Sequence, residues 1–181
     1  MNFNFRLADD NDLSDIMELM NQTRDTICPK EWFVEDTEDS VRHILAGNGF
    51  IILAMPQHSE EMAGFFIIKF PGLSEENLGN WIDFSDDKLL LSAHMESTAV
   101  YPAFRGYHLQ AQMAAEAEKL LVKMPYRYLF ATVHPDNHYS MNNMLSRDYQ
   151  VIKKAKMYGG LDRAILLKKI VPCHSRRLAV Q

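Results

Sequence analysis

The order of apolar and polar residues in the first part of the chain predicts one strand, two helices and a pair of buried strands. Phe3–Leu7 alternates apolar with polar residues, which is typical of a strand with one buried face. Apolar residues then recur at helical spacing in two stretches, the second of which starts near Asp36. The positions on these two apolar helix faces are Leu13, Ile16, Met17, Met20, Val41, Ile44 and Leu45. Residues 50–54 and 62–70 are almost continuously apolar, so we expect a hairpin buried on both faces of a sheet.

The rest of the chain alternates strands and helices after one long segment without a period. Residues 71–87 show neither helical nor strand spacing, and a connection of this length is usually functional or disordered. The elements expected after this loop are a strand over 89–101, a helix over 107–123, a strand over 128–133, a helix from Asp136 or Asn137 to about Ser146, and strands over 149–157 and 163–169. Gly159-Gly160 predicts a hairpin turn between the last two strands.

The turn between the strand over 89–101 and the following helix carries the clearest chemical signal. Arg105 and Gly106 lie directly before the predicted helix. The first N–H groups of a helix have no partners within it and carry partial positive charge, so they can bind an anion. Gly106 lets the backbone approach a phosphate closely, and Arg105 adds a permanent charge. The sequence therefore predicts a phosphate site here, with an ordinary strand–turn–helix unit as the alternative.

The residues around this turn resemble the coenzyme A motif of the GNAT acyltransferases (Gcn5-related N-acetyltransferases). In that family a strand, a pyrophosphate-binding turn and a helix carry the pattern R-G-x-G-x-G/A, and residues 105–110 here read R-G-Y-H-L-Q. His108 thus stands at the second glycine and Gln110 at the last small residue. Asn137 and Tyr149 match a later family motif, in which an Asn after a strand precedes a helix and a strand with an aromatic residue. The order of predicted elements is also that of the family.

The resemblance implies the fold class and the domain organisation. We expect an α/β fold of the α+β mixed-sheet kind, with a central, mostly antiparallel sheet of about seven strands. Strands four and five would be splayed, and helices would flank the sheet. Residues 1–171 are expected to form a single GNAT-like domain, and residues 172–181 a basic C-terminal tail.

The same resemblance implies that acetyl-CoA is the co-substrate. Its pantetheine arm would pair with the exposed backbone of Ala99, Val100 and Tyr101, as an added strand does. Its pyrophosphate would lie on the turn, whose residues are Arg105, Gly106, Tyr107, His108, Leu109 and Gln110. Asn137 and Ser140 would contribute near the arm.

Acyl transfer to an amine also requires a base, and the strand over 89–101 supplies two candidates. GNAT enzymes often place a catalytic Glu on this strand, and Glu96 has the same parity as Thr98 and Val100. His94 shares that predicted face and is the second candidate. The structural alternatives are a carboxylate paired inside the sheet for Glu96 and an ordinary hydrogen-bonded histidine for His94.

The acid that protonates the leaving thiolate is not evident from the sequence. Many GNAT enzymes use a Tyr about seven residues after the Asn, and that position is Met144 here. Tyr139 and Tyr158 are the remaining candidates. This departure keeps a second class of function open, a non-catalytic module that binds CoA or an acyl-CoA and regulates a partner.

The acceptor is expected to be cationic. The loop over 71–87 interleaves acidic and aromatic residues, and Trp81, Asp83 and Phe84 are its candidate acceptor contacts; the alternative is a surface loop whose Trp81 packs on the domain. Residues 1–100 hold 19 acidic and 6 basic side chains, and residues 101–181 hold 5 acidic and 13 basic ones. An acidic half would attract the amine of a small molecule or peptide, and a basic half a phosphate-rich co-substrate.

Composition limits the other function classes. A net charge of −5 argues against a general nucleic-acid binder, and no apolar run approaches the roughly 20 residues that cross a bilayer. The two cysteines, together with an N-terminus that lacks a signal-peptide layout, favour a cytoplasmic setting. No Cys/His spacing suggests a metal site, and a homodimer stays open. A different α/β fold with another phosphate ligand ranks last, because the P-loop lysine pattern and the full dinucleotide fingerprint are missing.

Overall fold

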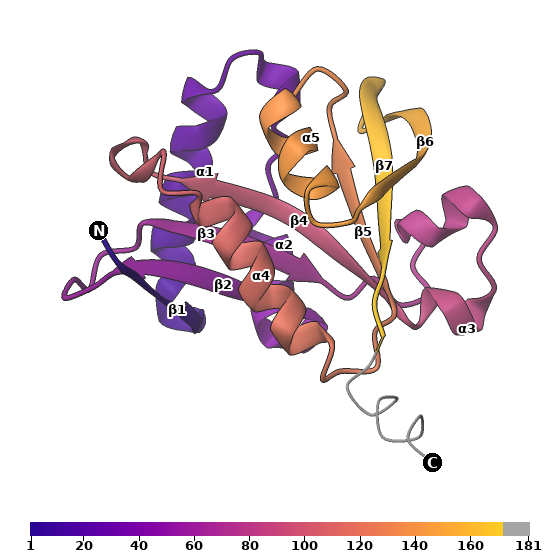
Figure 1. The fold of residues 1–181 in the computed structure, drawn as a ribbon, viewed down its shortest axis with the longest axis horizontal. Coiled ribbons are helices and arrows are strands. Elements are labelled where there is room, and N and C mark those ends of the chain that lie inside the picture. Colours follow the sequence, from indigo (N-terminus) through magenta and orange to yellow (C-terminus); the bar gives the residue numbers. More distant parts are fainter. Residues whose placement is uncertain (172–181) are drawn as a thin grey trace.

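Seven strands form one mixed sheet with helices on both of its faces (Figure 1). The computed structural model describes residues 1–171, so the predicted basic tail over 172–181 lies outside the described residues. The strands are β1 (Phe3–Leu7), β2 (Gly49–Pro56), β3 (Gly64–Lys69), β4 (Ser92–Val100), β5 (Tyr128–Val133), β6 (Gln150–Met157) and β7 (Leu161–Lys169). The helices are α1 (Leu13–Thr26), α2 (Glu38–His43), α3 (Asp86–Leu89), α4 (Leu109–Leu121) and α5 (His138–Leu145).

The sheet has the order β1-β2-β3-β4-β5-β7-β6, and only its central pair is parallel. The strands β1 to β4 form an antiparallel meander, and β5, β7 and β6 form a second antiparallel group. The predicted mostly antiparallel sheet of about seven strands is confirmed. The chain crosses from one group to the other through α4, because parallel neighbours need a long connection.

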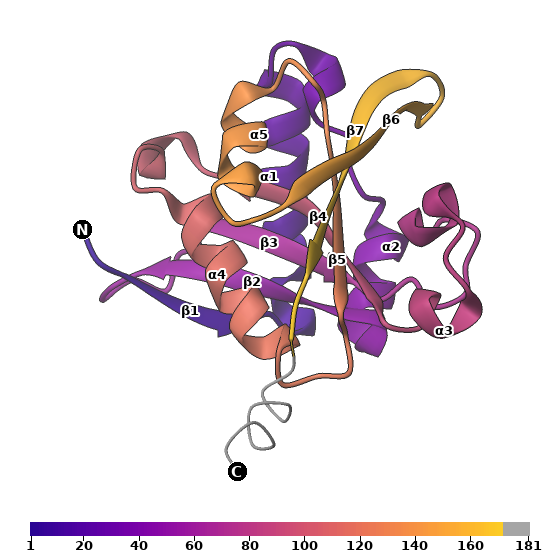
Figure 2. The same cartoon turned by 45° about the vertical axis from the view of Figure 1, so that its right-hand side comes forward.

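Two helical layers enclose the sheet. Helix α4 lies across one face, while α1 and α2 lie on the other (Figure 2). The buried face of α4, which includes Met113 and Ala117, packs on one core cluster together with Met144 of α5. The buried face of α1, which includes Ile16 and Met20, packs on a second cluster. Strands β2 and β3 contribute to both clusters, as their continuous apolar sequence predicts.

The two antiparallel groups are joined along only part of their length. Ser92–Met95 of β4 pairs with Tyr128–Ala131 of β5, and the pairing stops there. Strand β4 nevertheless continues to Val100 and β5 to Val133. The two strands therefore diverge beyond Met95 and Ala131, and the predicted splay of strands four and five is present.

A β-bulge in β4 lies at the point of divergence. Met95 pairs with Ile68 and Thr98 with Phe66, so two residues of β4 oppose one of β3. An extra residue reverses which face the following side chains point to. Met95 accordingly packs in the cluster beneath α4, whereas Ala99, which has the same parity, packs in the cluster beneath α1.

Because of the bulge, the prediction that Glu96 shares a face with Val100 was wrong. Equal parity was expected to place Glu96 on one face with Thr98 and Val100. Val100 instead packs against the cluster beneath α4, while Glu96 points with His94 to the opposite face. A bulge depends on the partner strand, so strict period-two counting along β4 does not detect it.

The segment expected as a loop over 71–87 has regular structure of its own. It forms the short helical turn η4 (Leu78–Ile82) and α3, and β4 therefore begins at Ser92 instead of residue 89. Asn77 organises the segment, since its buried amide donates to the carbonyl oxygens of Gly72 and Leu89 and its Oδ1 accepts from the N–H of Gly79. Side-chain bonds of this kind fold a segment that has no hydrophobic period.

Helix α4 is shorter than the predicted helix over 107–123. His108 precedes it with φ of 56° and ψ of 30°, a left-handed conformation that cannot continue a right-handed helix.

Within residues 1–171, none of the helices has the length and apolar character required to cross a membrane.

Candidate active site

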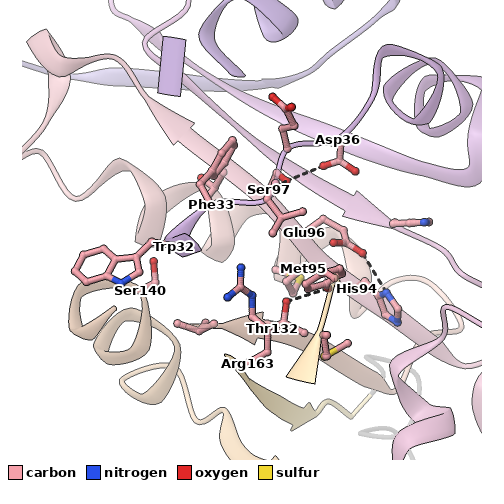
Figure 3. A pocket seen from close by; sticks show the side chains of 18 of the residues that line it. Trp32, Phe33, Asp36, His94, Met95, Glu96, Ser97, Thr132, Ser140 and Arg163 are labelled. Atoms are coloured by element: carbon pink, nitrogen blue, oxygen red, sulfur yellow. Dashed lines mark hydrogen bonds and ion pairs between the residues drawn. The ribbon is translucent and has the colours of Figure 1, made fainter. Parts of the chain in front are cut away.

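A cavity of about 550 Å³ lies where β4 and β5 diverge (Figure 3). Its walls include Met95 and Met144, which belong to the core beneath α4. They also include Trp81, which packs with a small cluster on the opposite face of the sheet. The cavity thus passes through the sheet at the divergence and connects its two faces.

Glu96 stands in the wall of this cavity, in the β4 bulge. Its Oε1 lies 3.1 Å from His94 Nδ1, and its side chain keeps 25% of its surface exposed. Burial raises the pKa of the Glu96 carboxyl, but the hydrogen bond with His94 and the charge of Lys69 outweigh burial and hold the pKa below its ordinary value. Glu96 is therefore ionised at neutral pH and able to accept a proton.

His94 is buried and uses both ring nitrogens in hydrogen bonds. Its Nε2 accepts from the backbone N–H of Leu78 at 3.1 Å, which requires that nitrogen to be unprotonated. The proton of the neutral ring therefore sits on Nδ1 and is donated to Glu96. His94 is only 3% exposed and has no nitrogen left for an acceptor amine, so the geometry favours a positioning role over the role of base.

A second carboxylate lies near Glu96 in the same cavity. Asp36 accepts hydrogen bonds from Ser97 Oγ at 2.7 Å and from Ser40 Oγ at 3.2 Å. Burial raises the pKa of Asp36, and the charge of Glu96 raises it further. Lys69 also lines the cavity, where it pairs with Glu76 at 2.6 Å. The wall formed by the α1–α2 connection and β4 is therefore rich in carboxylates.

Tyr158 of the β6–β7 turn is the tyrosine that reaches the cavity. Its hydroxyl lies 3.2 Å from Thr132 Oγ1 of β5. Burial raises the pKa of Tyr158, and the charge of Glu96 adds to the increase, so the phenol stays protonated at neutral pH. Tyr139 points away, with 80% of its surface exposed, and Met144 presents a thioether that carries no proton. The geometry therefore favours Tyr158 over Tyr139 as the candidate acid.

The predicted phosphate turn lies at the start of α4, and of its residues only Gln110 lines the cavity. Gly106 has φ of +87°, which a residue with a Cβ rarely adopts, and a Cβ there would meet no atom within 4 Å. His108 keeps the left-handed backbone that the family pattern assigns to a glycine, and its side chain is exposed. Arg105 and Tyr107 are exposed, whereas Leu109 is buried in the core and offers only its backbone N–H. The backbone of the turn thus has the conformation expected of an anion site.

The predicted contacts of the pantetheine arm divide into two groups. Asn137 and Ser140 line the cavity, where Gln110 of the predicted phosphate turn joins them, and Asn137 caps α5 by accepting the Ser140 N–H at 3.1 Å. Ala99 and Val100 pair with β3 on one side, and Tyr101 donates its N–H to Ala63. The other edge of residues 96–100 does not pair with β5, so its backbone N–H and C=O groups are available to an added strand. An acyl-CoA arm could pair there.

The three predicted acceptor contacts have different surroundings. Trp81 lines the cavity, and Lys153 Nζ lies 5.4 Å from the centre of its ring. Phe84 packs instead on Tyr128 and Phe130, and Asp83 is exposed and outside the cavity lining. Only Trp81 is therefore placed to contact an acceptor.

Sequence reasoning missed several cavity residues, of which four matter for the chemistry. Asp36 marked only the start of a predicted helix, and Trp32 lies between the two predicted helices, outside either apolar face. Thr132 and Arg163 lie in strands and gave no signal beyond strand propensity. These four come from the α1–α2 connection, β5 and β7, and no spacing rule joins positions so far apart in sequence.

Comparison with solved structures identifies the fold. Arabidopsis thaliana NAA60 in complex with acetyl-CoA matches over 93% of this chain and 99% of its own, with 18% identity and a TM-score of 0.73. The ribosomal-protein-alanine N-acetyltransferase of Brucella melitensis matches over 92% and 99%, with 15% identity and a TM-score of 0.71. The ribosomal-protein-S18-alanine N-acetyltransferase of Escherichia coli matches over 94% and 95%, with 14% identity and a TM-score of 0.69. The chain therefore has the GNAT fold that its motifs predicted. No family model matches the sequence. No curated protein matches it either.

Proposed function

We propose that this chain, which has the GNAT fold, is an acetyl-CoA-dependent N-acetyltransferase that acts on the amine of a small molecule or peptide. The observation that carries the proposal is the cavity at the divergence of β4 and β5, with the ionised Glu96 in its wall. The solved structures of the same fold support it, because one contains acetyl-CoA and two carry the name of N-acetyltransferases acting on protein alanine.

The chain offers three groups of residues to acetyl-CoA. The turn over 105–110 would bind the pyrophosphate through N–H groups at the start of α4. The free edge of 99–101 would bind the pantetheine arm, and Gln110, Asn137 and Ser140 would line its path. Acetyl-CoA supplies an activated thioester when bound.

The side chains around the cavity account for the proton transfers. A cationic acceptor loses two protons. Glu96 accepts the first and passes it to solvent, which frees the nitrogen lone pair to form a bond to the acetyl carbon. The second leaves the nitrogen as the carbon–sulfur bond breaks, and it replaces the proton that Tyr158 gives up. Tyr158 donates its proton to the departing thiolate, so that free CoA is released as a thiol. His94 holds the Glu96 carboxylate in place, and Asp36 adds negative charge that attracts a cationic acceptor.

A non-catalytic CoA-binding module remains the second candidate function. Met144 at the usual position of the acid and His108 in the turn favour it. In that case the cavity would bind CoA or an acyl-CoA without transferring the acyl group.

The first experiment is a thermal shift with acetyl-CoA, with CoA and NAD as comparisons. A ligand that binds only the folded protein stabilises it by about 2.7 kcal/mol at a hundredfold excess over Kd. A rise in melting temperature with acetyl-CoA and not with NAD supports the co-substrate. No rise at millimolar acetyl-CoA contradicts both candidate functions.

The second experiment separates the two candidates. Release of free CoA thiol is measured across a panel of amines for the wild type, Glu96→Gln and the matched control Glu75→Gln, an exposed carboxylate outside the cavity lining. We expect Glu96→Gln to lower kcat about 100-fold, as loss of general base catalysis does, and Glu75→Gln to leave it unchanged. Unchanged transfer in Glu96→Gln removes Glu96 from the role of base. Binding of acetyl-CoA without transfer to any amine favours the non-catalytic module.

A further inference from the structure

Arg163 is a buried cation whose charge no side chain of residues 1–171 neutralises. It lies at the start of β7 and is 3% exposed. Its Nη1 donates to the carbonyl oxygen of Asp162 at 2.8 Å and its Nη2 to that of Glu31 at 2.7 Å. The carboxylate of Asp162 is engaged elsewhere, at 2.7 Å from Lys156 Nζ. Carbonyl oxygens accept hydrogen bonds without cancelling a net charge. The guanidinium also lies 5.6 Å from the centre of the Tyr158 ring, and the charges of Glu31 and Asp162 act on it without forming an ion pair, so no carboxylate is bonded to Arg163 within residues 1–171.

The guanidinium of Arg163 faces the cavity. Arg163 belongs to the cavity lining, and Figure 3 shows its guanidinium pointing into the cavity, between Trp32 and Met95 in this view. A guanidinium carries donors in a planar fork that matches a carboxylate, and the backbone carbonyls engage only part of them. Because an uncompensated buried charge is costly, an anion entering this cavity would be bound favourably.

Trp32 adds a second unused donor to the same cavity. Its indole Nε1 is buried and has no hydrogen-bond partner within the described part of the chain. Buried donors are rarely left unpaired, so this N–H is a candidate ligand contact. Trp32 ends the short turn η2 (Lys30–Trp32), and Arg163 holds this turn through the carbonyl of Glu31. The turn that carries Trp32 is therefore attached to Arg163, and both side chains line the same cavity.

The other charged side chains of the cavity wall are Glu35, Asp36, Lys69, Glu76 and Glu96. Glu35 pairs with Arg24 and Lys69 with Glu76, whereas Glu96 and Asp36 lie across the cavity from the Arg163 guanidinium in Figure 3. An amine would be attracted to the carboxylates and an acid group to Arg163. The cavity thus has two poles of opposite sign.

We propose that Arg163 and Trp32 form a carboxylate subsite, and that the acceptor is a small amine that also carries a carboxylate, such as an amino acid. Its ammonium group would face Glu96 and Asp36 while its carboxylate accepts from the guanidinium and the indole N–H. This inference rests on the proposed function, because it specifies the acceptor of the same site. A peptide amino terminus has no free carboxylate beside the amine and would be a poor acceptor.

The first test compares acids with their matched amides on the wild-type protein. The probes are the standard L-amino acids and the ω-amino acids from glycine to 6-aminohexanoate, each beside its carboxamide, with CoA present. Binding is followed by tryptophan fluorescence, since Trp32 and Trp81 are the two tryptophans of the chain and both line the cavity. We expect the best acid to bind at least about tenfold more tightly than its amide, as loss of a charge-assisted hydrogen bond implies. Equal binding of acids and amides would overturn the proposal.

The second test uses variants of the subsite. Arg163→Gln is expected to raise KM for the best acid at least about tenfold and to leave KM for its amide unchanged. Trp32→Phe, which keeps an aromatic ring and removes the N–H, should raise KM for the acid severalfold. Arg42→Gln is the matched control, because Arg42 is exposed on α2 and outside the cavity lining. If Arg163 only anchors η2, Arg163→Gln will impair acid and amide alike, which contradicts the subsite. Trp32→Phe provides the same comparison if Arg163→Gln fails to fold.

The two readouts separate this inference from the proposed function. If acids bind more tightly than amides but no CoA thiol is released, the subsite is supported and catalysis is contradicted. If acetyl groups are transferred to amines with no preference for those that carry a carboxylate, the proposed enzymatic function is supported and the subsite is contradicted.

Discussion

His94 illustrates how a single residue links a distant segment to the candidate base. It accepts a hydrogen bond from Leu78 of η4 and donates one to Glu96, and both bonds require the same neutral tautomer. Protonation of His94 would break the bond to Leu78. The arrangement therefore fixes the orientation of the Glu96 carboxylate and lowers its pKa.

Replacing His94 should change the pH dependence of activity. In His94→Asn the imidazole donor that lowers the pKa of Glu96 is lost, so that pKa rises. Since Glu96 works in its ionised form, activity is lost as pH falls through this pKa. The acid limb of the kcat/KM profile should therefore move to higher pH in the variant, and a profile that extends well below pH 4.5, the ordinary pKa of a Glu carboxyl, checks this.

The control for this experiment is His43→Asn, because His43 is exposed on α2. Its acid limb should coincide with that of the wild type. If His94→Asn has an unchanged acid limb and only a lower melting temperature, His94 is merely structural. Such a loss of stability is expected in any case, at about 1–3 kcal/mol, because the buried N–H of Leu78 loses its acceptor.

The turn and the start of α4 form the element on which the co-substrate proposal depends. Gly106 and His108 both have positive φ, and this pair of left-handed residues directs the chain into α4. His108 adopts the conformation without being glycine, which costs about 1–2 kcal/mol. The motif is therefore retained by the backbone although the sequence departs from the family pattern.

Gly106→Ala should weaken acetyl-CoA binding by changing the backbone conformation of the turn, and not by a steric clash of the added methyl group. A Cβ at Gly106 meets no atom within 4 Å, so the change acts through its φ of +87°. We expect a loss of about 1 kcal/mol in the free energy of unfolding and a weaker Kd for acetyl-CoA, measured by calorimetric titration.

Gly72→Ala is a closely matched control, because Gly72 has φ of +55° and equally open surroundings, in the segment before η4. It should lose comparable stability and keep the wild-type affinity for acetyl-CoA. Equal Kd values in the two variants would exclude the turn from the binding site.

The two groups of strands are joined by the sheet, by the core beneath α4 and by a cluster of ion pairs. Strands β4 and β5 share four residue pairs, and the divergence beyond them forms the cavity. Behind it, Glu118 of α4 pairs with Arg147, which follows α5, at 2.7 Å and with Lys168 of β7 at 2.8 Å. This ion cluster ties the crossover helix to the second group of strands.

Glu118→Gln should destabilise the protein without altering the site. Its side chain is 12% exposed, and loss of its charge leaves two partly buried cations close together. We expect a decrease of about 2–4 kcal/mol in the free energy of unfolding, measured by urea denaturation, with KM for acetyl-CoA unchanged. Glu116→Gln on the same helix removes only an exposed pair with Lys119 and should cost less than about 0.5 kcal/mol. Equal costs for the two variants would contradict this role of Glu118.

Much of the architecture follows from local sequence. The strand predicted over 128–133 has the bounds of β5, and the other predicted strands and most helix positions agree with the structure to within a few residues. Hydrophobic period and turn residues act over a few neighbours, which is why they can be deduced from the chain alone. The splay of β4 and β5 was inferred through the family motif, and the phosphate site of the turn, which was inferred from Arg105, Gly106 and the helix start, stays a prediction.

The site required contacts between residues far apart in the sequence. The bulge at Glu96 depends on how β3 pairs with β4, and the tautomer of His94 depends on η4, which showed no period. Arg163 resembles an ordinary polar residue at the start of a strand until Glu31 and Trp32 are placed beside it. Periodicity records which face of an element is buried, whereas the charge, protonation and partners of a buried polar group are set by whatever the fold brings against it.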